Sequence, residues 1–541
     1  MPKNGNTGSI ISQFEREKMA EHHLELAPGA REKVFIQKFY LYLNMTKPSD
    51  ALYLTFSAVG TDGKALRRSY LIGTLLKMFP QMQIQEIEEA EQACNAMTPE
   101  NAIRFFVDGL QQGKTNEAQW QALANWYLSK EEYKREMQHL LSAAFLLNRN
   151  EPISHAVTKA MYGTVLENSV TRLERFAACA FAHYLQYGLK LGERRLQQFA
   201  GVDMGNIYHD ALEWFAKRVE HSDYTWFDMP EELQYTWIEE CMNAAIEDSR
   251  DGGDFTEARN QYLLERMKET IRRTVWALTV QIQKGKFIPS AFEVSFSQAD
   301  NLKAVNFTLS EEEKMRLRGR IDRVDTYETD DKVYVKIIDY KSGNTSFSLL
   351  NFYHGLQLQL VVYMNAALEL TAKKHPDKAV EPAGIFYYHI ENPMVDGYGM
   401  ESEAEIQRAV LEKLKLNGLV NENETVYQAM DTDFSGTSAV IPIALKSDGS
   451  LKATSKTAST ADFKTMSDYA KKVLLRCGQE ILDGDVEIKP YSLDKRTGCD
   501  YCPYHAVCGF DTRISGFSFR NLEKFDDENT ILENMRQKGQ E

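Results

Sequence analysis

The chain has 541 residues, 43% of them hydrophobic, so about two to four domains with well-formed cores are expected. It contains no apolar run of about 18 residues, so the sequence predicts no transmembrane helix. The formal net charge of −15 does not by itself favour a nucleic-acid-binding protein, but basic residues can still gather in one channel of an acidic chain.

Near the N-terminus, residues 39–56 resemble the last motor motif of superfamily 1 helicases. In that motif a helix ends in a threonine and is followed by an arginine-containing loop and a strand. Here the loop is Lys47-Pro48-Ser49, without the arginine that senses a γ-phosphate. The sequence also lacks a G-x-x-x-x-G-K phosphate loop followed by Ser or Thr. The resemblance implies that residues 1–80 are the remnant of an inactivated helicase-like domain, which this chain enters midway.

Helices are expected next along the chain. Residues 81–165 are dense in Glu, Gln, Ala and Leu with an amphipathic pattern, which predicts a helical connector. Another amphipathic helix is expected from Gly205 onward, with Asp203 as its N-cap. Gly205 and His209 share a face of that helix, where the missing Cβ lets another backbone approach. A single histidine on a helix is more often a packed residue than a ligand, so the helix alone assigns His209 no role.

Two neighbouring strands carry the most informative charges of the chain. Residues 316–327 alternate as a strand does, residues 328–331 form a polar turn, and residues 332–338 are rich in β-branched side chains. In an antiparallel pair joined by this turn, Asp322 and Asp339 both lie far from the turn and can meet across the strands. The pattern therefore predicts a β-hairpin with two facing carboxylates.

Lys341 follows Asp339 by two residues and projects from the same face of the sheet. Two carboxylates suit a hard cation such as Mg²⁺ or Mn²⁺, which activates water and neutralises charge on phosphate oxygens. The lysine ammonium can orient the attacking water or stabilise the transition state. The hairpin thus predicts metal-dependent phosphodiester hydrolysis, and the alternative is an exposed hairpin with solvated charges. Arginines of the first strand, such as Arg320 and Arg323, are either phosphate contacts or solvated charges.

After the hairpin, one long helix is expected over roughly 349–373. Gln359 and Tyr363 lie one turn apart on it and can both point back over the sheet edge. By themselves they are equally well explained as core and rim residues. Elsewhere we expect strands over 291–296 and 383–388 and an insertion loop over 445–461.

The order and setting of these residues resemble the RecB-like branch of the PD-(D/E)XK nuclease superfamily. The matching positions are His209, the strand Gly319–Asp322, the run Asp339–Lys341 and the pair of Gln359 and Tyr363. The resemblance implies an α/β fold with a mixed sheet flanked by helices. It implies that the metal ligands are His209, Asp322, Asp339 and the backbone carbonyl of Tyr340. It also implies that Lys341 is the catalytic lysine and that Gln359 and Tyr363 position this lysine or the DNA.

The chain has seven cysteines, and three of them, Cys499, Cys502 and Cys508, are spaced C-x2-C-x5-C. This number, without a secretory signal, favours a reducing, cytoplasmic compartment. In such a protein the spacing is typical of a metal or iron–sulfur site rather than of disulfides. A cubane cluster needs a fourth thiolate, and the pattern does not choose among Cys94, Cys179, Cys241 and Cys477.

Residues 171–185 resemble the segment that carries the distant first cysteine in the AddB family, which belongs to AddAB-type helicase–nucleases. Ala180 stands where that family has a proline. The resemblance implies a nuclease domain over 166–541, stapled at its C-terminal end by a 4Fe–4S cluster on Cys179, Cys499, Cys502 and Cys508. Zn²⁺ on the same thiolates and unligated cysteines are the alternatives.

The AddB-like resemblance covers essentially the whole chain and implies a metal-dependent DNA exonuclease subunit. With an AddA-like helicase–nuclease as its heterodimer partner, it would process double-strand DNA ends for recombinational repair and degrade the 5′-terminated strand. Two alternatives stay open. One is a DNA-binding scaffold subunit with incidental nuclease activity, and the other is a stand-alone RecB-like iron–sulfur exonuclease.

Overall fold

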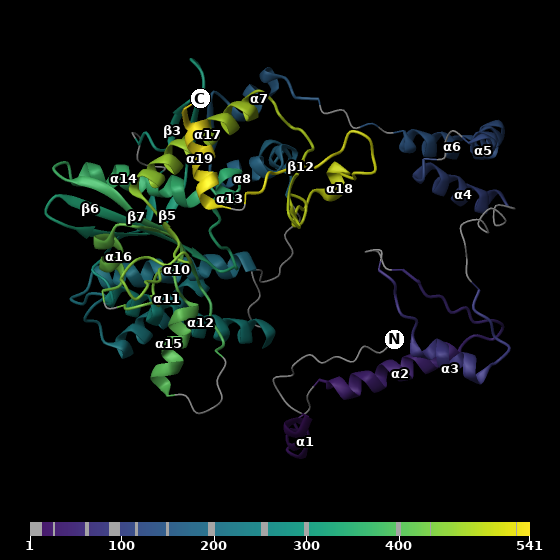
Figure 1. The fold of residues 1–541 in the computed structure, drawn as a ribbon, viewed down its shortest axis with the longest axis horizontal. Helices are drawn as coiled ribbons and strands as arrows, with labels where there is room; N and C mark the ends of the chain where they lie inside the picture. Colours follow the sequence, from purple (N-terminus) through teal and green to yellow (C-terminus); the bar gives the residue numbers. More distant parts are fainter. Residues whose placement is uncertain are drawn as a thin grey trace. The chain divides into compact units, whose positions relative to one another are not determined.

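The protein was analysed as a computed structural model, and the residues that it describes divide into two compact units, Met1–Met137 and Gln138–Glu541 (Figure 1). The described residues are 13–24, 27–59, 64–85, 98–113, 117–145, 147, 151–192, 201–249, 258–296, 302–395, 402–432, 434–525 and 527–540. Among the helices in these ranges, none combines the length and the apolar character needed to cross a membrane. The boundary between the units falls within the stretch expected to be a helical connector.

The first unit is helical. Its helices are α1 (Gln13–Glu21), α2 (Ala30–Thr46), α3 (Tyr70–Met78), α4 (Pro99–Gln111) and α5 (Ala118–Ser129), and α6 (Glu131–Ala144) crosses the boundary. The strand expected after Thr46 does not form, because the described residues 51–57 find no partner strand and Tyr53 is 88% exposed. A single extended segment cannot satisfy its backbone groups without a neighbouring strand.

The second unit is built on a six-stranded sheet of order β2-β5-β6-β7-β8-β9. Its strands are β2 (Ile288–Ser295), β5 (Arg320–Glu328), β6 (Lys332–Lys341), β7 (Ala379–His389), β8 (Asn417–Asn421) and β9 (Thr457–Ala458). The pairs β6–β7 and β8–β9 are parallel and the other pairs are antiparallel, so the predicted mixed sheet is confirmed. The expected hairpin is also confirmed, because β5 pairs with β6 from Arg323 opposite Ile338 to Glu328 opposite Val333.

Helices cover both faces of this sheet (Figure 1). One face packs against α8 (Val170–Ala178), α14 (Gln359–Lys374) and α17 (Thr460–Leu482). The other packs against α10 (Gly201–Glu220), α11 (Glu231–Asp248), α12 (Ala258–Gln283), α15 (Glu403–Lys413) and α16 (Glu424–Met430). Along β6, Ile337 belongs to the first core and Ile338 to the second, because successive side chains of a strand point to opposite faces.

Smaller elements surround this core. Two three-stranded sheets consist of β1 (Val165–Asn168), β4 (Lys314–Leu317) and β3 (Asn306–Thr308), and of β11 (Arg496–Thr497), β10 (Tyr491–Leu493) and β12 (Arg520–Asn521). The remaining helices are α7 (His155–Tyr162), α9 (Ala180–His183), the π-helix η3 (Tyr184–Gly188), α13 (Leu349–Tyr353), α18 (His505–Cys508) and α19 (Glu528–Gln540).

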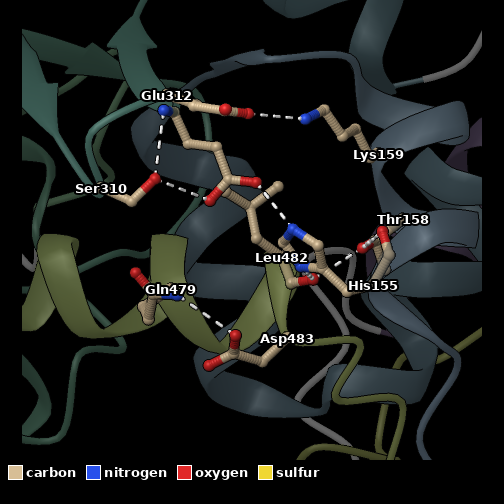
Figure 2. A network of polar contacts seen from close by, with 9 residues as sticks. His155, Thr158, Lys159, Ser310, Glu312, Gln479, Leu482 and Asp483 are labelled. Carbon is tan, nitrogen blue, oxygen red and sulfur yellow. Dashed lines mark hydrogen bonds and ion pairs between the residues drawn. The ribbon is translucent and has the colours of Figure 1, made fainter.

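Within the second unit, a polar network connects α7 to segments distant in the sequence (Figure 2). The imidazole of His155 lies 3.0 Å from the Leu482 carbonyl through Nδ1 and 2.9 Å from the Glu313 carboxylate through Nε2. The Thr158 hydroxyl donates to the same Leu482 carbonyl at 2.6 Å. These contacts join α7 to the C-terminal end of α17 and to the turn between β3 and β4, far apart in the sequence.

The single strand predicted over 316–327 is wrong, because the chain breaks there into β4 and β5, which belong to different sheets. At the break, a Cβ on Gly319 would collide with the Phe296 ring, so only glycine fits where the chain changes sheets. The single helix predicted over 349–373 is wrong as well, because α13 and α14 are separated by residues 354–358. Gly355 at φ +77° lies in this break, in the left-handed conformation that commonly follows the last turn of a helix.

Two smaller expectations also need correction. Asp203 is not an N-cap, because α10 begins at Gly201 and includes Asp203 in its first turn. The loop expected over 445–461 ends earlier than predicted, at β9 and the start of α17. There Ser459 accepts a hydrogen bond from the Asp462 N–H and caps α17, so the residues after it are helical.

Candidate active site

The two aspartates of the hairpin and His209 lie together at one end of the sheet. Asp322 and Asp339 are buried, with 7% and 2% of their surfaces exposed. The Asp322 carboxylate accepts a hydrogen bond of 2.7 Å from the backbone N–H of Tyr340 and lies 3.5 Å from Nδ1 of His209 on α10. The Tyr340 side chain packs on the face of the sheet that α10 covers, with its ring centroid 6.1 Å from that of His209. Strand pairing and one helix thus bring the first predicted ligands into contact.

Lys341, Gln359 and Tyr363 form the second half of the site. The Lys341 ammonium lies 2.6 Å from Asp339 Oδ2 and donates to Gln359 Oε1 at 3.1 Å. The amide nitrogen of Gln359 donates to Asp339 Oδ1 at 2.8 Å and to the Tyr363 hydroxyl at 3.1 Å. Gln359, the first residue of α14, therefore connects the lysine, one aspartate and the tyrosine through a single side chain.

Glu293 on β2 joins this site, and the sequence analysis did not find it. Its side chain is 5% exposed, and its Oε1 lies 3.7 Å from Nδ1 of His209. Its other carboxylate oxygen pairs with the Arg320 guanidinium. The backbone of Glu293 has φ +49°, close to a bulge between Pro289 and Ala291 that interrupts the β2–β5 register. Bulges and positive φ values re-aim side chains and occur at functional sites.

One signal in the sequence pointed to Glu293. It is the one charged residue of the mainly apolar strand expected over 291–296. An acidic side chain in a buried strand needs a partner or a role, because burying an unpaired charge is costly.

The electrostatics of the site favour binding of a cation. Burial raises the pKa of Asp322 to about 6, which His209 counteracts, and the Glu293 charge raises it further. Burial and the neighbouring Asp322 raise the pKa of Asp339 to about 6, although Lys341 opposes this. Burial lowers the pKa of His209, but its hydrogen bond to Glu293 and the nearby aspartate charges outweigh burial and raise it. Such crowding of buried carboxylates is relieved when a cation neutralises them.

The donor set fits a divalent metal. His209, Glu293 and Asp322 each offer one ligand atom, and these atoms lie within 4.8 Å of one another. Carboxylate oxygens are the preferred ligands of Mg²⁺, and Mn²⁺ accepts carboxylate and imidazole together. Asp339 adds a further carboxylate whose charge interacts with Asp322 and His209. The structure therefore supplies one more carboxylate than the sequence predicted.

Four cysteines gather at a second place in this unit. Burial raises the pKa of Cys499 to about 11, and the neighbouring Cys179, Cys502 and Cys508 raise it further. Cys179, the residue that ends α8, packs with Cys502 and Tyr504 in a small buried cluster. The Arg175 guanidinium donates to Cys502 Sγ at 3.3 Å. Thiolates are the ligands of iron–sulfur clusters and of many zinc sites, so these four cysteines are a candidate ligand set.

The other cysteines lie elsewhere. Cys241 is buried in the core against α10–α12, and Cys477 is buried in the core on the opposite face of the sheet. Cys94 lies outside the described residues. Of the three candidates in the described ranges, Cys179 is the one whose charge interacts with the cysteines of the C-x2-C-x5-C run.

Comparisons with known proteins agree with this geometry. The chain is 37% identical over 539 residues to the B subunit of the ATP-dependent helicase/deoxyribonuclease of Lachnoclostridium phytofermentans, covering 98% of this chain and 46% of the relative. It is 32% identical to the protein of the same name from Clostridium tetani, again over 98% of this chain and 46% of the relative. The chain thus spans about half the length of these curated relatives, which support the resemblance to the AddB family.

The family model of the PD-(D/E)XK nuclease superfamily matches residues 167–509. That range contains both aspartates, the lysine and the glutamine of the site, as well as the four gathered cysteines. On this match, and with this sheet and this site, the chain belongs to the PD-(D/E)XK nuclease superfamily.

Proposed function

We propose that this chain is the metal-dependent deoxyribonuclease portion of an AddB-type component of an ATP-dependent helicase/deoxyribonuclease. The observation that carries the proposal is the convergence of His209, Asp322, Asp339 and Lys341 on one buried end of the sheet. The names of the relatives support the assignment to this component.

In this proposal His209, Asp322, Asp339 and the Tyr340 carbonyl hold Mg²⁺ or Mn²⁺, and Glu293 adds a carboxylate. When bound, the cation supplies Lewis-acid stabilisation of the charge on the phosphate. Gln359 and Tyr363 orient the Lys341 ammonium, which contacts Asp339 and Gln359 in the structure.

The proposed reaction is hydrolysis of a DNA phosphodiester. A water oxygen attacks phosphorus in line as the bond to the 3′-oxygen breaks, so the products are a 3′-hydroxyl and a 5′-phosphate. In this proposal the Lys341 ammonium orients this water and stabilises the negative charge of the transition state. Its contact with Asp339 keeps the ammonium next to the carboxylate that also faces the metal site.

The proposal extends to the whole chain. We propose that residues 1–80 are a helicase-like remnant, that 81–165 connect it, and that 166–541 form the nuclease domain. The protein would pair with an AddA-like helicase–nuclease in the cytoplasm and act as an exonuclease on the 5′-terminated strand of double-strand ends during recombinational repair. We further propose that Cys179, Cys499, Cys502 and Cys508 hold a 4Fe–4S cluster.

Single substitutions in the hairpin test the proposal. Asp339→Ala removes a metal ligand and Lys341→Ala removes the ammonium, so each should lower Mg²⁺-dependent cleavage of 5′-labelled single-stranded DNA by at least about a hundredfold. Lys332→Ala is the matched control, since Lys332 lies at the other end of β6 and pairs with Glu381. It should cleave as the wild type does.

The same experiment separates the alternatives. Unchanged cleavage by Asp339→Ala and Lys341→Ala would contradict the nuclease assignment. If those variants also bound DNA normally, the chain would be a DNA-binding scaffold. Cleavage by a chain that never co-purifies with a large ATPase partner would instead favour a stand-alone exonuclease.

A further inference from the structure

α8 contributes a carboxylate to the start of α14. One oxygen of Glu174, Oε1, accepts a hydrogen bond of 2.6 Å from the backbone N–H of Leu358 and one of 3.0 Å from the backbone N–H of Gln359. Leu358 is the N-cap residue of α14, and its aliphatic side chain cannot accept a hydrogen bond. The first N–H groups of a helix have no partner within the helix. Glu174 fills this role from a position 184 residues earlier in the chain.

The cap belongs to a well-anchored helix. Leu173 and Phe176, on either side of Glu174 in α8, are buried in the core that α8 shares with α14. Ser169 caps α8 by accepting a hydrogen bond from the Arg172 N–H. Because α8 is capped at its start and packed along its buried face, the Glu174 carboxylate has a defined position next to the start of α14.

The capped residue is the one that organises the lysine. Gln359 receives the second Glu174 hydrogen bond through its backbone, while its side chain contacts Lys341, Asp339 and Tyr363. A side chain that makes three contacts needs its own backbone in a defined position, since active-site geometry tolerates little displacement. The break at residues 354–358 makes this support necessary, because α14 is not continued from α13.

From these contacts we propose that Glu174 is a positioning residue of the nuclease site, which holds the Gln359 backbone so that Gln359 can orient Lys341. The proposal rests on the proposed function and deepens it. Glu174 touches neither the predicted metal ligands nor the lysine through a hydrogen bond of its own, so it acts through Gln359.

Two variants of Glu174 and one matched control test this role in the 541-residue chain. Glu174→Ala removes the acceptor, whereas Glu174→Gln keeps an oxygen of the same reach. Glu369 is the control, because it lies on the same α14 and its carboxylate also accepts two backbone hydrogen bonds, from Lys303 and Ala304 at 2.9 Å each. Glu369→Ala removes an equivalent pair of hydrogen bonds away from the site.

We expect kcat for a 5′-labelled single strand with Mn²⁺ to fall by about tenfold or more in Glu174→Ala, with KM and the Kd for Mn²⁺ within about twofold of wild type. Glu174→Gln should keep at least about a third of kcat, and Glu369→Ala should keep wild-type kcat. Amide hydrogen exchange of Leu358 and Gln359 should become faster in Glu174→Ala only.

Three results would overturn the proposal. The first is a Glu174→Ala chain with kcat within about twofold of wild type. The second is an equal loss of kcat in Glu369→Ala, which would show a general weakening of α14. The third is a Glu174→Gln chain as slow as Glu174→Ala, which would indicate a charge effect instead of a cap.

Failure of the proposed function is distinguishable from failure of the cap. If the wild-type chain cleaves no DNA with Mg²⁺ or Mn²⁺, the nuclease assignment fails. Amide hydrogen exchange still tests the capping role of Glu174 in that case, because unchanged exchange at Leu358 and Gln359 in Glu174→Ala would refute it.

Discussion

Glu293 combines three properties. Its carboxylate is almost fully buried, its backbone has a positive φ, and its neighbours are His209 and Arg320. The positive φ carries a cost for any residue with a side chain. The Arg320 guanidinium pairs with one carboxylate oxygen and leaves the other facing His209. These contacts support a role at the metal site.

We therefore predict that Glu293→Gln weakens Mn²⁺ binding by about tenfold, because it removes one negative charge from the ligand group. Isothermal titration of the purified chain with Mn²⁺ measures this. Glu381→Gln is the control, since Glu381 pairs with Lys332 at the opposite end of the sheet. Equal Mn²⁺ affinity in wild type and Glu293→Gln would exclude Glu293 from the metal site.

Arg323, next to Asp322 on β5, fits neither of the two roles that the sequence analysis considered for it, a phosphate contact or a solvated charge. It is 1% exposed and makes two hydrogen bonds, of 2.6 and 2.8 Å, to Asp325. Lys336 lies 2.9 Å from the same carboxylate. Arg323 is therefore neither a solvated charge nor a phosphate contact. Asp325 is the shared carboxylate partner of two buried cations.

Removing Asp325 should be strongly destabilising. Asp325→Ala leaves Arg323 and Lys336 buried without their counter-ion, which costs about 3–5 kcal/mol of unfolding free energy. Urea denaturation measures the loss. Glu412→Ala, which removes the exposed partner of Arg408, should change stability by less than about 1 kcal/mol. A similar small effect of Asp325→Ala would show that the buried charges find other partners.

At the scale of elements, the contact between α8 and α14 makes stability depend on pH. Burial raises the pKa of Glu174 from 4.5 to about 7, although the backbone N–H groups of Gln359 and Leu358 lower it. The folded chain thus keeps a proton on Glu174 up to about pH 7, while the unfolded chain loses it near pH 4.5. The unfolded state is then favoured increasingly as the pH rises through this window.

Glu174→Gln cannot ionise, so it removes this pH dependence. We predict that the melting temperature of Glu174→Gln, relative to wild type, increases as the pH rises from about 4.5 to 7 and is constant above that range. Thermal unfolding followed by circular dichroism at intervals of about one pH unit measures the difference. A difference that does not change with pH would contradict a raised Glu174 pKa.

At the scale of the whole second unit, the gathered cysteines join its two ends. Cys179 ends α8 near the start of the unit, whereas Cys499, Cys502 and Cys508 lie beyond the sheet and α17. A ligand bound by all four would close a loop that contains the entire nuclease core. By analogy with cross-links, such closure stabilises the fold by a few kcal/mol, on the order of 2–5.

We predict that anaerobically purified chain contains iron and sulfide in 4Fe–4S stoichiometry and that Cys179→Ala loses both. The loss should also lower the unfolding free energy by about 2–5 kcal/mol, because the loop is no longer closed. Cys241→Ala, which changes a buried cysteine in the core against α10–α12, should retain the iron. Zinc in place of iron and sulfide would contradict the cluster but preserve the four-thiolate site.

The sequence by itself determined the hairpin, the mixed α/β character and the residues that meet at its end. The sequence predicted that Asp322, Asp339 and Lys341 lie together, because strand periodicity and a turn place residues on one face without long-range information. Likewise, spacing identified Gln359 and Tyr363 as neighbours, since one helical turn separates them.

Only the tertiary structure determined which side chains from distant parts of the chain contact these residues. Glu293 lies next to a bulge in β2. Glu174 accepts a hydrogen bond from Gln359, 185 residues later in the chain. Cys179 lies near the C-terminal cysteines, at the other end of the unit's sequence. The break between α13 and α14 was hidden as well, because the apolar pattern continues through it. Periodicity reports the environment along one element, whereas these contacts depend on how separate elements pack, which no local pattern records.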